Sequence, residues 1–260
     1  MTAEKSRAIV IRAVPFGETS SVVSLFCREF GKVRALAKGA WRPKSGFDGA
    51  LDLLSTCQVL VLRKSSGGLD LLTEAFLENR FRVGGSYRAF LGGMHVAELL
   101  DALTADADPQ PDLFDRAHDT LRELSGLDEP ADRLPALLVA TELAFLRLTG
   151  HAPALFACAE CRTPLHGPGR TPFGMLDGGC LCGRCRAGKR AVISVSPDGL
   201  AALRLLAGKA AAWRDVPLPP AVEGELRPIM TTYLSHVLGR PTRVARLLQS
   251  RMAPRRARSE

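Results

Sequence analysis

Four cysteines in two short pairs are the residues whose types and spacing point most directly to chemistry. Cys158 and Cys161 form one Cys-x-x-Cys pair, and Cys182 and Cys185 form a second pair after an interval of twenty residues. Each pair can direct two thiolates at one ion, and the interval can fold back as a hairpin. The pattern is typical of a zinc ribbon, in which four sulfurs hold a structural Zn²⁺ ion.

The residues around these cysteines favour a bound metal over a pair of disulfides or four free thiols. A Zn²⁺ ion with four thiolates carries two net negative charges and attracts cations. Five cations lie close in the sequence: Arg162, Arg184, Arg186, Lys189 and Arg190. Residues 158–185 include six glycines and three prolines. They leave little apolar material for a core, so the segment needs the metal to fold.

A fifth thiol, that of Cys180, lies close to the second pair. A gap of one residue between Cys180 and Cys182 does not form the usual knuckle, so we favour Cys182 and Cys185 as ligands. A site closed by four thiolates has no position left for water or substrate. We therefore predict a structural metal rather than a catalytic one.

The composition predicts a soluble globular protein with real cores. The chain has 260 residues, of which 46% are hydrophobic. It shows no signal-peptide pattern at the N-terminus and no apolar run long enough to cross a membrane. Cys27 and Cys57 each lie alone in an apolar stretch, where we expect buried free thiols. These features indicate a cytoplasmic protein.

Charge is distributed unevenly along the chain. Residues 1–80 carry 12 Lys and Arg against 8 Asp and Glu, residues 81–157 carry 6 against 12, and residues 158–260 carry 17 against 7. The two basic ends suggest contacts with a polyanion, although charge also serves solubility. The last ten residues are rich in arginine and have no apolar period, so we expect a basic tail that holds phosphates or simply solubilises the chain.

The first eighty residues read as β-structure. Five short runs rich in Val, Ile, Leu and Phe are separated by turn residues, at positions 7–14, 21–26, 32–37, 57–62 and 69–74. Five short strands in this length predict a small closed barrel, and the five-stranded OB-fold is the economical choice. Its exposed face and loops bind single-stranded nucleic acid and oligosaccharides.

A basic segment follows the third predicted strand. It supplies four cations and one large aromatic residue within eleven positions: Arg34, Lys38, Trp41, Arg42 and Lys44. Cations neutralise phosphates, and an aromatic face stacks on an unpaired base. Trp41 has two readings that the sequence leaves open, a stacking platform or a ring half-buried against the barrel.

From residue 82 the pattern changes to helical spacing. Apolar residues recur at intervals of three and four over 87–100, 113–124 and 134–148, which predicts three helices that form a bundle with acidic outer faces. A short strand over 191–195 follows the ribbon, and helices are predicted from Ser196 to about Gly208 and over 222–238. The ribbon is then an insertion between helices.

The expected organisation is therefore an α+β multidomain protein. Residues 1–80 form an OB-fold nucleic-acid-binding domain, 81–157 the first part of a helical domain, and 158–190 a four-cysteine zinc-binding element. Residues 191–250 complete the helical domain, and 251–260 form a basic tail.

Catalytic signatures are missing from the sequence. Gly208-Lys209-Ala210 lacks the upstream glycine of a phosphate-binding loop, and no G-x-G-x-x-G follows a strand. The five histidines show neither H-E-x-x-H nor the H-x-E pairing of zinc deaminases. We do not expect an enzyme.

The order of these parts, together with several local motifs, resembles bacterial RecO, a recombination mediator and DNA-repair family. The motifs are Gly17-Glu18-Thr19-Ser20, Phe30-Gly31-Lys32, Ala37-Lys38-Gly39-Ala40, Arg42-Pro43-Lys44-Ser45, Leu148-Thr149-Gly150-His151-Ala152-Pro153, Gly178-Gly179-Cys180-Leu181-Cys182 and Leu238-Gly239-Arg240-Pro241. Together they span nearly the whole chain, and their order is more specific than any one of them.

The resemblance implies a protein that binds single- and double-stranded DNA and anneals complementary strands coated by single-stranded-DNA-binding protein. It implies action with RecR, and sometimes RecF, to help RecA replace that coat, with the acidic tail of the coat protein as a contact. By the same resemblance, residues 38–44 lie on the DNA-binding barrel, the four cysteines are structural zinc ligands, and the location is cytoplasmic and nucleoid-associated. Trp41 and Cys180 depart from the family pattern.

Two other classes share some of these features. An OB-fold plus zinc-ribbon RNA-binding module in translation or transcription would have the same charge and metal. A zinc-dependent nucleic-acid enzyme would instead need an open metal site and carboxylates placed for acid and base catalysis.

Overall fold

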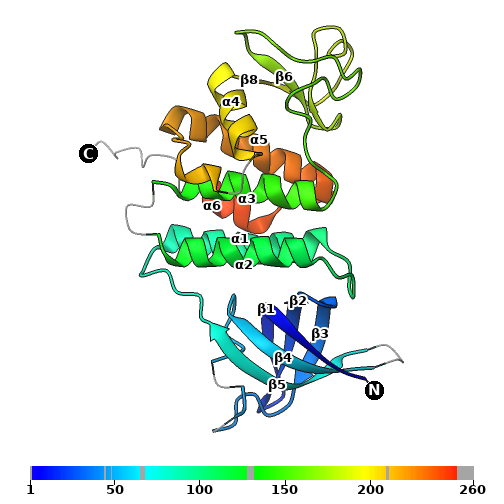
Figure 1. The fold of residues 1–260 in the computed structure, drawn as a ribbon, viewed down its shortest axis with the longest axis vertical. Helices are drawn as coiled ribbons and strands as arrows, with labels where there is room; N and C mark the ends of the chain where they lie inside the picture. Colours follow the sequence, from blue (N-terminus) through cyan, green and yellow to red (C-terminus); the bar gives the residue numbers. More distant parts are fainter. Residues whose placement is uncertain are drawn as a thin grey trace, which may run out of the picture. The chain divides into compact units, whose positions relative to one another are not determined.

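A computed structural model of the chain describes residues 2–43, 45–47, 49–64, 68–127, 132–208 and 211–250 (Figure 1). It forms two compact units, residues 1–128 and 129–260. The division falls after the second helix, inside the stretch 81–157 that was predicted to be one part of a helical domain.

The first unit begins with a closed five-stranded barrel, drawn in blue to cyan in Figure 1. Its strands are β1 (Thr2–Phe16), β2 (Ser20–Cys27), β3 (Gly31–Ala37), β4 (Thr56–Arg63) and β5 (Asp70–Asn79). The order around the barrel is β1-β2-β3-β5-β4, and only the β3–β5 pair is parallel. The predicted OB-fold barrel is confirmed.

The barrel core consists of the inward side chains of alternating strand positions. Val23, Leu25 and Cys27 of β2 are fully buried, as is Cys57 of β4. Burial raises the pKa of the Cys57 thiol to about 12 and also raises that of Cys27, because the thiolate is poorly solvated there. Both cysteines are buried free thiols, as predicted.

Two helices complete the first unit, α1 (Tyr87–Leu103) and α2 (Pro111–Ser125). The Ser86 side chain caps α1 by accepting the Ala89 N–H. Gly93 lets α1 approach Phe81 closely, since an added Cβ would lie 2.6 Å from that ring. The close approach at this glycine is therefore to an aromatic side chain outside the helices.

Several acidic residues of the helical region are paired with barrel cations. Arg28 donates two hydrogen bonds of 2.8 Å to the Asp115 carboxylate on α2. Lys32 Nζ donates to the backbone oxygens of Asp101 (2.7 Å) and Thr104 (2.9 Å), where a cation satisfies the carbonyls at the end of α1. These contacts attach the two helices to the barrel.

The second unit contains α3 (Leu134–Leu148), α4 (Pro197–Leu206), a 3-10 turn η1 (Ala212–Arg214), α5 (Pro220–Leu238) and α6 (Arg243–Ser250). Helix α3 packs against α4 and α5, so the segment between residues 148 and 197 is an insertion between contacting helices, as expected. Ser196 caps α4 through the Gly199 N–H (3.0 Å), and Gly239 ends α5 in a left-handed conformation.

One ion pair is buried inside this helical unit. Arg227 of α5 donates a hydrogen bond to the Glu142 carboxylate of α3, and their side chains are 6% and 0% exposed. The pair therefore lies out of solvent at the contact between the two helices. In the part of the chain that the structure describes, no helix is both long and apolar enough to cross a membrane.

Candidate metal centre and nucleic-acid interface

The inserted segment folds around a small antiparallel sheet. Its strands are β6 (Thr171–Gly174), β7 (Gly179–Cys180) and β8 (Val192–Val195), in the order β7-β6-β8. The turn between β6 and β7 is the hairpin that the cysteine spacing predicts. It brings the second cysteine pair back toward the first.

Backbone contacts on both sides of Cys180 hold the two cysteine pairs together. Cys180 N–H donates to the Ala154 oxygen (2.7 Å), and its own oxygen accepts from Ala159 N–H (2.8 Å). Gly179 is required at this crossing, because its φ is +141° and an added Cβ would lie 2.4 Å from the Ala154 backbone. The buried Cys180 is thus a residue of the sheet.

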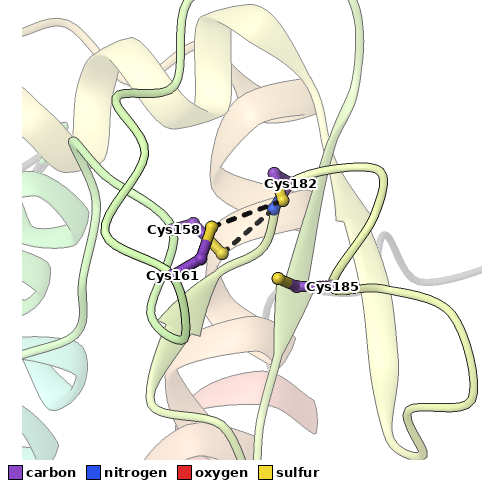
Figure 2. Close-up of side chains that lie close together, drawn as sticks. All are labelled: Cys158, Cys161, Cys182 and Cys185. Carbon is purple, nitrogen blue, oxygen red and sulfur yellow. Dashed lines mark hydrogen bonds between the residues drawn. The ribbon is translucent and has the colours of Figure 1, made fainter.

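The sulfurs of Cys158, Cys161, Cys182 and Cys185 lie within 4.8 Å of one another. Figure 2 shows the two pairs projecting from two loops toward one space. The Cys161 and Cys182 sulfurs are 3.7 Å apart, and tetrahedral Zn²⁺ with bonds of about 2.3 Å requires a separation of about 3.8 Å. Cys182 N–H also donates to Cys158 Sγ (3.4 Å), a contact that favours a thiolate. The donor set and its geometry fit a four-sulfur metal site.

The pKa values of Cys158, Cys161 and Cys185 are shifted in different directions. The Thr163 hydroxyl lowers the pKa of Cys161 to about 6. Burial raises the pKa of Cys158, but nearby backbone N–H groups outweigh burial and leave it lowered. The Cys185 thiol donates to the Cys182 and Cys161 sulfurs, and these hydrogen bonds raise the pKa of Cys185 to about 12 because they stabilise its protonated form. Sulfurs crowded in this way cannot all be charged cheaply unless a cation lies between them.

Cations surround the cysteines, as the sequence predicts. Lys189 Nζ lies 2.8 Å from Glu160 and 2.9 Å from Asp177, which links the two cysteine loops and raises the pKa of the lysine. The four arginines of the group are exposed: Arg162, Arg184, Arg186 and Arg190. They give the element a positive surface.

The insertion is fastened to the helices by specific contacts. Arg204 of α4 donates to the backbone oxygens of Leu155 (2.9 Å) and Leu165 (3.1 Å). The Phe173 ring of β6 meets the Tyr233 ring of α5 edge to face, with centroids 5.6 Å apart. The position of the cysteine loops therefore depends on α4 and α5.

Four of the five residues predicted to contact nucleic acid lie on the described part of the barrel. Arg34 is exposed on the outer face of β3, where it forms an ion pair with Asp106, with 3.3 Å between Nη2 and Oδ2. Lys38 and Arg42 are exposed in the turns after β3, and among described residues neither forms an ion pair with a carboxylate. Lys44 lies outside the described residues, as does the predicted basic tail of residues 251–260.

Trp41 lies between these cations with 61% of its surface exposed. The backbone N–H of Trp41 donates to the backbone oxygen of Thr19 (2.9 Å), which holds the main chain in place while the ring stays exposed. The half-buried alternative for this ring is therefore not what the structure shows.

A hollow beside Arg34, lined by cations together with the carboxylates of Asp70 and Asp106, was not predicted from the sequence. It has a volume of about 450 Å³ and is lined by Arg34, Arg63 and Lys64, among others. Arg63 pairs with Asp70 at 2.9 Å, whereas Lys64 is exposed. The neighbouring Arg63 and Lys64, at the end of the fourth predicted strand, were the sequence signal that could have indicated this hollow.

Comparison with known proteins gives one consistent result. Residues 1–81 match the family model described as "Recombination protein O N terminal", and residues 85–246 match "Recombination protein O C terminal". A protein named DNA repair protein RecO from Rhodopirellula baltica is 40% identical over 78% of this chain and 74% of its own length. Proteins of the same name from Anaeromyxobacter dehalogenans and Myxococcus xanthus are 36% and 29% identical, over 94% and 90% of this chain and 95% and 91% of their own lengths.

Proposed function

The chain belongs to the RecO family of DNA repair proteins, and we propose that it is a recombination mediator without covalent catalysis. In this proposal it binds single- and double-stranded DNA and anneals complementary strands coated by single-stranded-DNA-binding protein. It then acts with RecR, and with RecF, to help load RecA in the cytoplasm. The acidic tail of the coat protein is a proposed contact.

The observation that carries this proposal is the exposed cationic segment on the barrel. Lys38 and Arg42 flank the exposed Trp41, and neither cation is neutralised by a described carboxylate. Arg34 and Lys44 extend the proposed interface along the chain. Such a surface grips phosphates without reading sequence, which suits a protein that acts wherever DNA is damaged.

Annealing also requires that two phosphate backbones be neutralised at once. The arginines of the cysteine element supply a second positive surface in the other compact unit. We propose that the four cysteines hold a structural Zn²⁺ ion that cross-links the two loops on which these arginines lie. The residues 1–80 would then be the principal DNA-binding domain and 158–190 an auxiliary basic element.

Removing the barrel cations is expected to change how DNA binding depends on salt. The Lys38→Ala/Arg42→Ala variant should bind single-stranded DNA more weakly and lose about 1.4 units of slope in log K against log salt, from about 0.7 unit per lost phosphate contact. Binding isotherms at four or five salt concentrations measure this slope.

A charge-matched control separates local contact from net charge. Lys5 and Arg12 are also exposed on the barrel, and the Lys5→Ala/Arg12→Ala variant removes the same charge. Its slope should stay close to that of the unaltered protein. If both double variants changed the salt slope equally, the DNA would lie elsewhere on the protein. Tighter binding to RNA than to DNA of the same sequence would argue against a repair role.

A further inference from the structure

A hollow of about 440 Å³ opens beside the segment that connects β3 and β4. Its floor is apolar: Phe47 belongs to the buried barrel core, and Ala13, Ala40 and Leu51 pack against that core. Trp41 and Arg42 also line it. The hollow therefore joins the edge of the barrel core to the cationic segment of the proposed DNA interface.

The polar groups of the hollow are held in place. Arg80 Nε lies 3.0 Å from Asp52 Oδ2, and both residues line the hollow. The Arg80 guanidinium rests against Gly49, where an added Cβ would lie 1.8 Å from Nη2. Gly49 also has a φ of +67°, so glycine is favoured there for two reasons. A paired guanidinium and carboxylate thus border an apolar floor.

The exposed Trp41 ring completes an arrangement that matches one class of ligand. A nucleobase has two flat faces that stack on an aromatic ring and an edge of donors and acceptors that a guanidinium and a carboxylate can meet. The phosphates on either side of that base would meet Lys38 and Arg42. An apolar floor alone would suit many ligands, but the aromatic ring, the paired charges and the flanking cations together favour a nucleotide.

We propose that this hollow seats one unpaired nucleobase of single-stranded DNA, with Trp41 stacked on its face and the Arg80–Asp52 pair at its polar edge. The inference rests on the proposed function, because it takes DNA as the ligand. A base within a duplex is covered on both faces and paired at its edge, so it cannot enter without being extruded. The hollow therefore gives the protein a preference for single strands that its cations alone do not provide.

The first test compares matched single- and double-stranded oligonucleotides at one salt concentration. Trp41→Ala should weaken binding to the single strand by about 5- to 150-fold, which corresponds to about 1–3 kcal/mol for one stacked base. Binding to the duplex should be unchanged. Trp41→Phe should retain most of the single-strand affinity, because a phenyl ring still stacks.

The control is Phe76→Ala, which removes an aromatic residue of β5 that is 63% exposed and does not line the hollow. It should leave both affinities unchanged. An equal loss of single-strand affinity in Phe76→Ala, or an equal loss for duplex and single strand in Trp41→Ala, would overturn the assignment.

Tryptophan fluorescence supplies an independent readout, since the chain has two tryptophans and Trp213 is only 4% exposed. A dT oligonucleotide should quench the emission of the unaltered protein and of Trp213→Phe, and it should not quench that of Trp41→Phe. Quenching by an acidic peptide, but not by the oligonucleotide, would assign the hollow to a peptide and overturn the proposal.

Different results would contradict the base site and the proposed function. If the single strand binds with unchanged affinity to Trp41→Ala, the hollow is not a base site, although DNA binding stands. If the unaltered protein binds neither single strand nor duplex, the proposed function itself fails.

Discussion

Replacing Cys158 with serine is expected to release the metal and unfold the cysteine element. The apparent binding free energy of structural zinc in small domains is about 10–16 kcal/mol, which is comparable to the whole stability of a typical domain. Apolar packing within the segment cannot make up for the lost metal-binding energy. Residues 158–190 hold few buried apolar side chains, among them Phe173, Met175 and Leu181. Metal content per chain and proteolysis within the segment measure the effect.

Cys180→Ala is the matched control for this experiment. Its thiol is buried in β7, has a pKa raised to about 11 by burial, and lies outside the four-sulfur group. This variant should keep one metal ion per chain and resist proteolysis. Full metal content in Cys158→Ser, or loss of metal in Cys180→Ala, would contradict the proposed ligand set.

Breaking the buried Arg227–Glu142 pair is expected to destabilise the helices of the second unit strongly. Arg227→Met takes this ion-pair partner from a carboxylate that is 0% exposed, and removing one member of a buried ion pair costs about 3–5 kcal/mol. Arg227→Met should therefore lower the free energy of unfolding by about that amount in denaturant titrations. The Arg227→Met/Glu142→Leu double variant should recover much of the loss, because neither charge then remains buried.

An exposed pair gives the comparison. The Arg28 and Asp115 side chains are 37% and 44% exposed, so Asp115→Asn should cost no more than about 1 kcal/mol. The hydrogen bonds from Arg28 lower the pKa of Asp115 in the folded protein. The stability that this ion pair contributes is therefore present above pH about 3.9, the pKa of an unfolded aspartate, and is lost as the pH falls through the pKa of the folded state. If Asp115→Asn lowered the free energy of unfolding more than Arg227→Met did, the buried pair would not be the more stabilising of the two.

Local patterns predicted most elements because burial in this protein follows the periodicity of each element. Alternating residues such as Val23 and Leu25 point into the barrel, and α3 has the bounds that its apolar spacing indicated. The cysteine pairs also come together, because their separation and the glycines between them allow a hairpin. In each case the signal lies within about thirty residues.

Features that depend on distant partners were not predicted. The polar start of β1 is strand because Thr2 to Glu4 pair with the end of β4, and no local pattern shows that pairing. Helix α6 was missed, although Ala245 and Leu248 are buried at helical spacing, because the surrounding arginines suggested only a basic end. The contact of Lys32 with the end of α1 was not predicted, since it depends on where α1 ends.

The candidate DNA interface shows the same limit. Sequence spacing found Arg34, Lys38, Trp41 and Arg42, but it did not show that Asp106 shares the charge of Arg34. It also could not show the hollow beside Trp41, whose walls include Asp52 and Arg80, ten and more residues away along the chain. A cavity is a property of side chains brought together by folding, so composition alone does not reveal it.

The most direct test of the central claim is the annealing rate of two complementary oligonucleotides, each coated with single-stranded-DNA-binding protein and followed by fluorescence. The unaltered protein should accelerate annealing without ATP, and the Lys38→Ala/Arg42→Ala variant should accelerate it less. Tight binding to the coated strands with no acceleration would contradict a mediator role.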